Sequence, residues 1–198
     1  MQLRLTYQGL LLGANGKNTR AAHKHEIRVA LHRQLRHHWE IHPYLSKVAL
    51  QDAENPSKYH MILPFMEEKY SRFGWRFVPL VTEFFKVRCS IQILLLRPDL
   101  PGSIIRSGDI DNRLKTLFDA LRLPQSVDEL GGADAPSTEE LPLYCLLEDD
   151  RLIDHVSVET DVLLQPVSTT NPTKNDVRVI ITVNLCPYVM TTNNMVFR

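Results

Sequence analysis

Apolar and polar residues alternate at the start of the chain, where Leu3, Leu5 and Tyr7 are separated by polar residues. A period of two is typical of a strand that buries one face. Further strands are predicted at residues 75–81, 87–96, 144–147, 156–164 and 177–185. The continuous apolar run at residues 93–96 suits a strand in the middle of a sheet.

A longer period predicts two helices, at residues 19–41 and 112–121, which end before Pro43 and Pro124. The apolar positions are Ile27, Leu31, Leu35 and Trp39 in the first, and Leu114, Leu117, Phe118 and Leu121 in the second. Strands and helices in this order predict an α+β fold, with a mixed β-sheet packed with two principal helices.

Composition limits the class of protein. The 198 residues are 43% hydrophobic and 23% charged, which favours one globular domain over residues 1–198 and excludes a disordered or collagen-like chain. Three widely spaced cysteines predict reduced thiols, and with no signal peptide or membrane-spanning run we expect a cytoplasmic protein. Residues 126–142 are acidic and rich in Gly, Pro and Ser, so we expect a mobile insertion that adds little to the core.

The net charge of zero conceals a separation of charge along the chain. Residues 1–50 contain eight Lys and Arg against two Glu, whereas residues 106–198 contain eight against fifteen Asp and Glu. This pattern fits an anion-binding face beside a carboxylate-rich, cation-binding site, and it fits an ordinary solvated surface equally well.

Carboxylates gather around the start of the second helix. Asp109 and Asp111 are two residues apart, so in extended chain both side chains leave the same face. Asp111 or Asn112 would then cap the helix, and Lys115 and Asp119 would share one side of it. Taken alone, a segment of this kind is most often an ordinary helix start with a solvated neighbour.

A second acidic doublet, Asp149 and Asp150, follows the predicted strand 144–147. If that strand pairs beside the chain leading to Asp109, the carboxylates meet and require a cation between them. Oxygen ligands without Cys or His suit Mg²⁺, with Mn²⁺ as a substitute, and a nearby lysine is typical of phosphoryl-transfer sites. The doublet could also be a simple turn, and the EF-hand pattern is not matched.

The segment from Asp109 to Leu121, with Asp149–Ile153 downstream, resembles the RusA family of Holliday junction resolvases. The family motif is Asp-Leu-Asp-Asn-x-x-Lys-x-x-x-Asp-Ala-Leu followed by Asp-Asp-x-x-Ile or Val. The resemblance implies a RusA-like fold and makes Asp109, Asp111 and Asp150 the essential carboxylates. It makes Lys115 the catalytic lysine and Asp149 a less certain ligand, while Asp119 is expected to form a structural hydrogen bond.

What the resemblance implies is a Mg²⁺-dependent endodeoxyribonuclease that cleaves branched DNA and acts as a homodimer, because two matched nicks require two identical sites. This chain lacks the dense basic run that usually precedes the first Asp, so phosphate contacts are expected elsewhere. The candidates are Lys17, Arg20, Lys24, Arg28, Arg33, Arg106 and Arg113. Two alternatives are an inactive nucleic-acid-binding protein of the same fold and a metal-dependent hydrolase of small phosphate compounds.

Overall fold

The computed structural model describes residues 1–14, 20–45, 47, 49–51, 57–98, 109–167 and 173–197, with the backbone alone for Gln51 and Asp109. The strands are β1 (Gln2–Leu10), β2 (Ala49–Gln51), β3 (Tyr59–Met61), β4 (Phe77–Val81), β5 (Val87–Arg97), β6 (Leu143–Leu147), β7 (Ile153–Val162) and β8 (Asp176–Pro187). The helices are α1 (Ala21–Ile41), α2 (Ile62–Lys69) and α4 (Asp109–Leu121). Short 3₁₀ turns are η1 (Val127–Leu130), η2 (Thr138–Glu140), η3 (Asp150–Leu152) and η4 (Thr192–Phe197).

The main sheet has four strands in the order β1-β8-β5-β7. Its first three strands are antiparallel neighbours, whereas β5 and β7 run parallel, so the sheet is mixed as predicted. Along β5, buried residues such as Ile91 and Ile93 alternate with more exposed ones such as Gln92. The period of two in the sequence therefore arises because one face of β5 is covered and the other is open.

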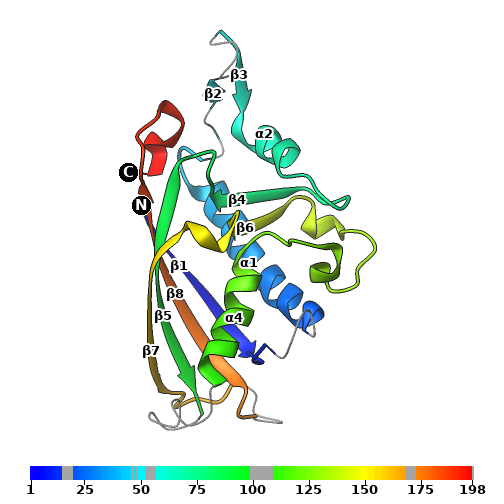
Figure 1. Cartoon of the computed structure of the whole chain (residues 1–198), viewed down its shortest axis with the longest axis vertical. Coiled ribbons are helices and arrows are strands. Elements are labelled where there is room, and N and C mark those ends of the chain that lie inside the picture. The colour runs from blue at the N-terminus through cyan, green and yellow to red at the C-terminus, as the bar shows by residue number, and fades with distance from the viewer. Residues whose placement is uncertain are drawn as a thin grey trace.

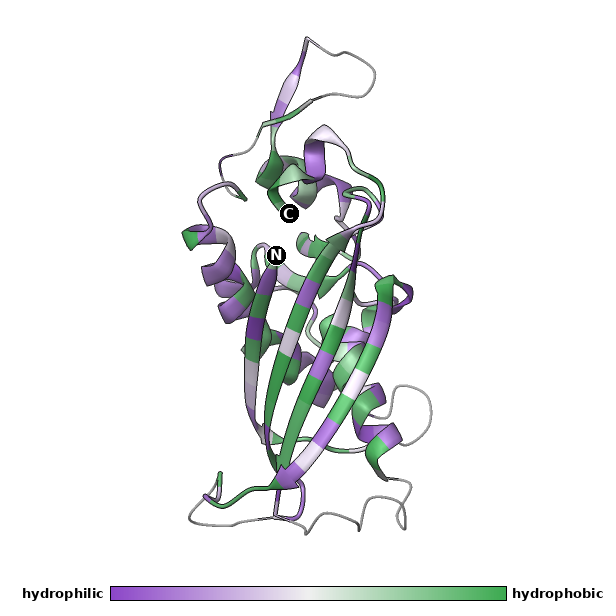
Figure 2. Cartoon of the chain, turned by 90° about the vertical axis from the view of Figure 1, so that its left-hand side faces the viewer, coloured by the Kyte–Doolittle hydropathy of each residue, from purple (hydrophilic) through white to green (hydrophobic). Residues whose placement is uncertain are grey.

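Helices α1 and α4 lie on the same side of the main sheet, as Figure 1 shows. Helix α1 buries the predicted stripe from Ile27 to Trp39, and α4 buries Leu117 and Leu121. Figure 2 views the sheet from its other side, where no described helix lies over the strands. The predicted α+β class, with two principal helices against a mixed sheet, is confirmed.

Strand β6 does not join the main sheet. It pairs in parallel with β4 and not with β5, and residues 99–108, which lead to Asp109, lie outside the described residues. Every residue of both strands is buried, and β6 packs against α1. A strand whose residues are all apolar has to be covered on both faces. Both strands of the β4–β6 pair are covered in this way.

The acidic segment 126–142 is fixed to the rest of the fold at several points, and its buried residues are Glu129 and Leu130. Leu130 is 1% exposed and Glu129 is also buried. The carbonyl of Glu129 accepts a hydrogen bond from Arg28 Nη1 at 3.0 Å, and Glu140 Oε1 lies 3.0 Å from His25 Nε2. The segment is thus fixed to α1 through polar contacts that its composition does not reveal.

The outer edge of β1 is contacted by a side chain of α1. Gln34 Oε1 accepts a hydrogen bond from the Thr6 amide at 2.9 Å, and Gln34 Nε2 donates to the Thr6 carbonyl at 2.7 Å. One side-chain amide thereby satisfies both backbone groups of an edge residue.

The β2–β3 hairpin and α2 were not predicted. All three residues of β3 are exposed, so this short strand leaves no alternation in the sequence. None of the described helices is long and apolar enough to cross a membrane.

Candidate active site

Helix α4 presents Asp111, Lys115 and Asp119 on one side, because residues four apart in a helix are neighbours. This side borders a cavity of about 330 Å³. The cavity is lined by Asp111, Leu114, Lys115, Phe118, Asp119 and Asp150. The structure therefore brings Asp111, Lys115 and Asp150 together, although the last is 35 residues or more from the other two in sequence.

The backbone at the first aspartates differs from the expectation. Helix α4 begins at Asp109, so the extended chain through Asp109 and Asp111 is wrong, and so is a helix cap at Asp111 or Asn112. The argument that placed both aspartates on one face required extended chain and does not apply. The side chain of Asp109 lies outside the described residues.

The acidic doublet reaches the cavity from the end of β6. Asp149 caps the turn η3, because its Oδ1 accepts a hydrogen bond from the Arg151 amide at 3.1 Å. Asp150 opens that turn, is exposed and lines the cavity. Asp149 is thus occupied with its own turn, and Asp150 is the member of the doublet that meets α4.

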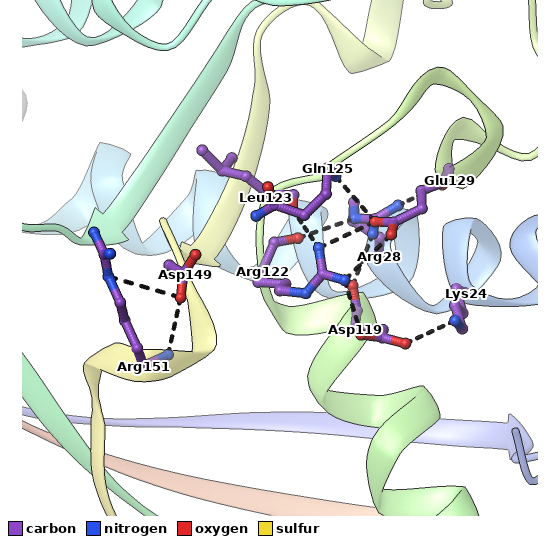
Figure 3. A network of polar contacts seen from close by, with 9 residues as sticks. All are labelled: Lys24, Arg28, Asp119, Arg122, Leu123, Gln125, Glu129, Asp149 and Arg151. Atoms are coloured by element: carbon purple, nitrogen blue, oxygen red, sulfur yellow. Dashed lines mark hydrogen bonds and ion pairs between the residues drawn. The ribbon is translucent and has the colours of Figure 1, made fainter. Parts of the chain in front are cut away.

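Asp119 is held in a network of ion pairs at the inner end of the same helix side. Its Oδ2 lies 2.7 Å from Lys24 Nζ and its Oδ1 lies 2.9 Å from Arg122 Nη2. Arg122 also contacts Glu129 at 3.1 Å. Figure 3 shows this network between α1, α4 and the acidic segment, with Asp149 and Arg151 to one side. Both oxygens of Asp119 are engaged by cations, which is a structural role.

The network also affects the protonation of its members. Burial opposes the charged form of Arg122, but hydrogen bonds and attraction from Glu129 and Asp119 raise its pKa above the ordinary value. Sequence reasoning missed Arg122 and Glu129. The only available signal was the spacing of three residues between Asp119 and Arg122 on one helix.

Three of the five described basic residues proposed for DNA contact are buried, and the prediction of a surface position is wrong for these three. Lys24 is 5% exposed, and Arg28 and Arg113 are each 1% exposed. Arg28 donates to the carbonyls of Asp119 at 2.8 Å and Glu129 at 3.0 Å, and Arg113 Nη2 donates to Asn175 Oδ1 at 2.9 Å. These side chains hold elements of the fold together.

The remaining basic candidates for DNA contact differ in their exposure. The side chain of Arg33 is 69% exposed and pairs with Glu139 at 3.3 Å, and Arg20 is half-buried just before α1. Lys17 and Arg106 lie outside the described residues. On the described surface, Lys115 is the cation that lines the cavity.

The side chains that line the cavity determine which metal ion it could bind. Among the described side chains, no three His, Cys, Asp or Glu residues lie close enough together to hold a metal ion. Mg²⁺ commonly takes only one or two carboxylates and completes its octahedron with water or phosphate oxygens. Asp111 and Asp150 fit that smaller set, with a lysine beside them for a phosphate.

Comparison with known proteins finds no matching family model, curated protein or solved structure. The interpretation of the cavity therefore depends on its own residues and on the two sequence motifs that meet there.

Proposed function

We propose that this protein is a Mg²⁺-dependent endodeoxyribonuclease that cleaves branched DNA, as the RusA family that its motifs resemble does. The observation that supports the proposal is the shared cavity of Asp111 and Lys115 from α4 and Asp150 from η3. Two motifs far apart in sequence meet there, as one metal-dependent site requires. The exposure of all three side chains leaves them accessible to a large substrate.

Each lining residue has a defined part in the proposed site. Asp111 and Asp150, with Asp109 as the third predicted ligand, would hold Mg²⁺, which when bound supplies a Lewis acid and a water of lowered pKa. Lys115 places a positive charge where the scissile phosphate gains negative charge. Leu114 and Phe118 supply the apolar part of the cavity lining.

The proposed enzyme is a homodimer. A four-way junction needs two symmetrical nicks, and a two-fold dimer supplies two identical sites in the matching arrangement. Arg33 and Arg20, with Lys17 and Arg106, remain the proposed phosphate contacts outside the cavity.

A hydrolase of small phosphate compounds is the second candidate. The cavity volume of about 330 Å³ lies within the range of small-molecule pockets. The burial of Lys24, Arg28 and Arg113 also removes three cations from the surface that duplex arms would need. The substrate assay must therefore include free nucleotides.

The deciding experiment compares cleavage of a four-way junction, a linear duplex and a free nucleotide, each with and without Mg²⁺. We expect Mg²⁺-dependent cleavage of the junction, and loss of this cleavage in Asp111→Asn, which keeps the side-chain size but removes the charge. Asp134→Asn is the matched control, because Asp134 is exposed on the acidic segment and does not line the cavity. Cleavage by Asp111→Asn at the wild-type rate would contradict the site, and turnover of nucleotides alone would favour the second candidate. Binding of the junction without cleavage would indicate an inactive nucleic-acid-binding protein.

A further inference from the structure

The apolar part of the candidate active site has no role in the proposed metal chemistry. That chemistry uses charged side chains of the cavity lining, namely Asp111, Lys115 and Asp150. Leu114 and Phe118 line the same cavity of about 330 Å³ and lie four residues apart on α4. Residues at this spacing are neighbours on a helix, so the two side chains form one apolar surface beside the charged groups.

The ring of Phe118 is only partly used by the core. The apolar stripe that α4 buries consists of Leu117, Ala120 and Leu121, which are at most 2% exposed. Leu114 and Phe118 lie beside this stripe and are half-buried, packed against the core and also lining the cavity. Packing therefore holds the ring of Phe118 in place and leaves part of it accessible to a ligand.

Charge divides the cavity into two ends. Lys115 and Phe118 are three residues apart on α4, which is a rise of about 4.5 Å along the helix. Beside Phe118, both oxygens of Asp119 are paired with Lys24 and Arg122, as Figure 3 shows. Because these two cations are already paired, Lys115 is the cation that attracts a phosphate. The end of the cavity at Phe118 is left for an uncharged part of the ligand.

A nucleobase suits this uncharged end. Its flat faces stack on aromatic rings, and every base has such faces. In a nucleotide strand each phosphate is joined through a sugar to a base, so a strand with its phosphate at Lys115 carries a base toward Phe118. A base inside a duplex is covered on both faces by its neighbours, and a cavity of about 330 Å³ admits one nucleotide but no duplex. The base at Phe118 must therefore be unpaired.

We propose that Leu114 and Phe118 form a stacking site for one unpaired base, in a nucleotide next to the phosphate that is cleaved. The inference rests on the proposed function, and it narrows the substrate to DNA that presents an unpaired nucleotide at the cleaved bond. A base leaves the stack at least cost where it is mismatched or already single-stranded. A branch point interrupts the stacking of the strands, so it meets this condition better than a continuous duplex does.

The test removes the ring and the base separately and together. Cleavage is first mapped on a junction, and the nucleotide on each side of the cleaved bond is then replaced in turn by an abasic unit. The value of kcat/KM is compared for the wild type and Phe118→Ala on the intact and the abasic junctions. Phe118→Trp keeps an aromatic ring, and Phe118→Leu replaces Phe118→Ala if the latter does not fold in thermal unfolding. Phe84→Ala is the matched control, because Phe84 is also half-buried but does not line the cavity.

We expect the wild type to cleave one of the two abasic junctions at least about fivefold more slowly than the intact junction, because base–aromatic stacking has effects of this size. Phe118→Ala should lose about as much on the intact junction and nothing further on that abasic junction, since both changes remove the same contact. Phe118→Trp and Phe84→Ala should keep the preference for the base. A wild type that cleaves all three junctions equally would overturn the stacking site. Losses that add in Phe118→Ala would also overturn it and make the ring a packing residue.

The outcome is separable from that of the proposed function. A nuclease without a preference for the base supports the nuclease and contradicts the stacking site. If no nucleic acid is cleaved, the nuclease is contradicted, and NMR titration with thymidine monophosphate and with deoxyribose 5-phosphate tests the site. Tighter binding of the nucleotide that Phe118→Ala abolishes supports the stacking site without the nuclease, whereas equal binding of the two contradicts both.

Discussion

Lys24 and Lys115 both lie beside one side of α4, and their surroundings give the two ammonium groups different roles. Lys24 is buried against Asp119, with 2.7 Å between Nζ and Oδ2. Lys115 is exposed, lines the cavity and has no ion pair with any described residue. One charge therefore stabilises the fold, and the other is free to meet a substrate.

We expect Lys115→Ala to lower single-turnover cleavage at least about 100-fold, because the loss of a preorganised positive charge at a reacting phosphate has effects of this size. The free energy of unfolding should change by less than about 0.5 kcal/mol, since an exposed side chain without a partner adds little stability. Lys115→Arg, which keeps the charge, is the control. A loss of stability together with an unchanged rate per folded molecule would make Lys115 a structural residue.

His32 is held in its neutral form by two backbone groups. Its Nδ1 accepts a hydrogen bond from the Tyr144 amide at 2.8 Å, so its Nε2 carries the hydrogen and donates to the Glu139 carbonyl at 3.0 Å. Burial, more than any other cause, lowers the pKa of His32 from its ordinary value of 6.5. Protonation of Nδ1 would break the contact with Tyr144.

This arrangement predicts the sign of a pH effect. The unfolded chain takes up a proton near pH 6.5, whereas native His32 does so only at lower pH, so the free energy of unfolding should fall as pH drops below about 6.5. Urea unfolding between about pH 8 and about pH 5 measures the slope, and His32→Gln should reduce it. His23, His25, His38 and His42 also have lowered pKa values and add to the same trend. A stability that is constant over this range would contradict the assignment.

At the scale of elements, the acidic segment 126–142 contributes one apolar side chain, Leu130, to the core. Leu130 belongs to η1, which contacts α1, and is 1% exposed, whereas Val127 of the same turn is 55% exposed. We expect Leu130→Ala to lower the free energy of unfolding by about 2–5 kcal/mol, because it leaves a cavity in a packed site. Val127→Ala should lower it by less than about 0.5 kcal/mol. Equal, small effects in the two variants, measured by urea denaturation, would restore the picture of a loose insertion.

Main-sheet strands such as β5 and the two principal helices were predictable because each buries one periodic face. Ile27 to Trp39 marks α1, and the alternation from Val87 to Arg97 marks β5. Partners in space were not predictable. The entirely apolar β6 could have paired with β4 or with the chain that leads to Asp109. The sequence alone does not distinguish between these two partners. Nor does a polar position on a helix reveal whether it meets solvent or, like Lys24 and Arg28, another element.

At the scale of the whole molecule, the basic first part of the chain binds the acidic second part. Lys24 pairs with Asp119, Arg33 with Glu139 and His25 with Glu140. The separation of charge along the sequence therefore brings distant segments together, and much of it is neutralised within the fold.

The salt dependence of DNA binding should reflect this neutralisation. Each lost phosphate contact lowers the log–log slope of binding against salt by ~0.9 for duplex arms. We expect Lys115→Gln to lower the slope by about one such unit and Lys24→Gln to leave it unchanged per folded molecule, because Lys24 is 5% exposed. Fluorescence anisotropy with a labelled junction measures both slopes. A lower slope in Lys24→Gln would return α1 to the DNA surface.

The amide of Gln34 has a consequence for how the protein avoids aggregation. An unpaired strand edge is a template for the addition of another chain, and β1 is such an edge. By bonding the amide and the carbonyl of Thr6, Gln34 occupies the two groups that an incoming strand would need first. A polymer that grew by strand addition at β1 would have to displace this side chain before it gained its first backbone hydrogen bond at Thr6. One glutamine on a neighbouring helix thus protects the backbone of Thr6 on the β1 edge from strand addition.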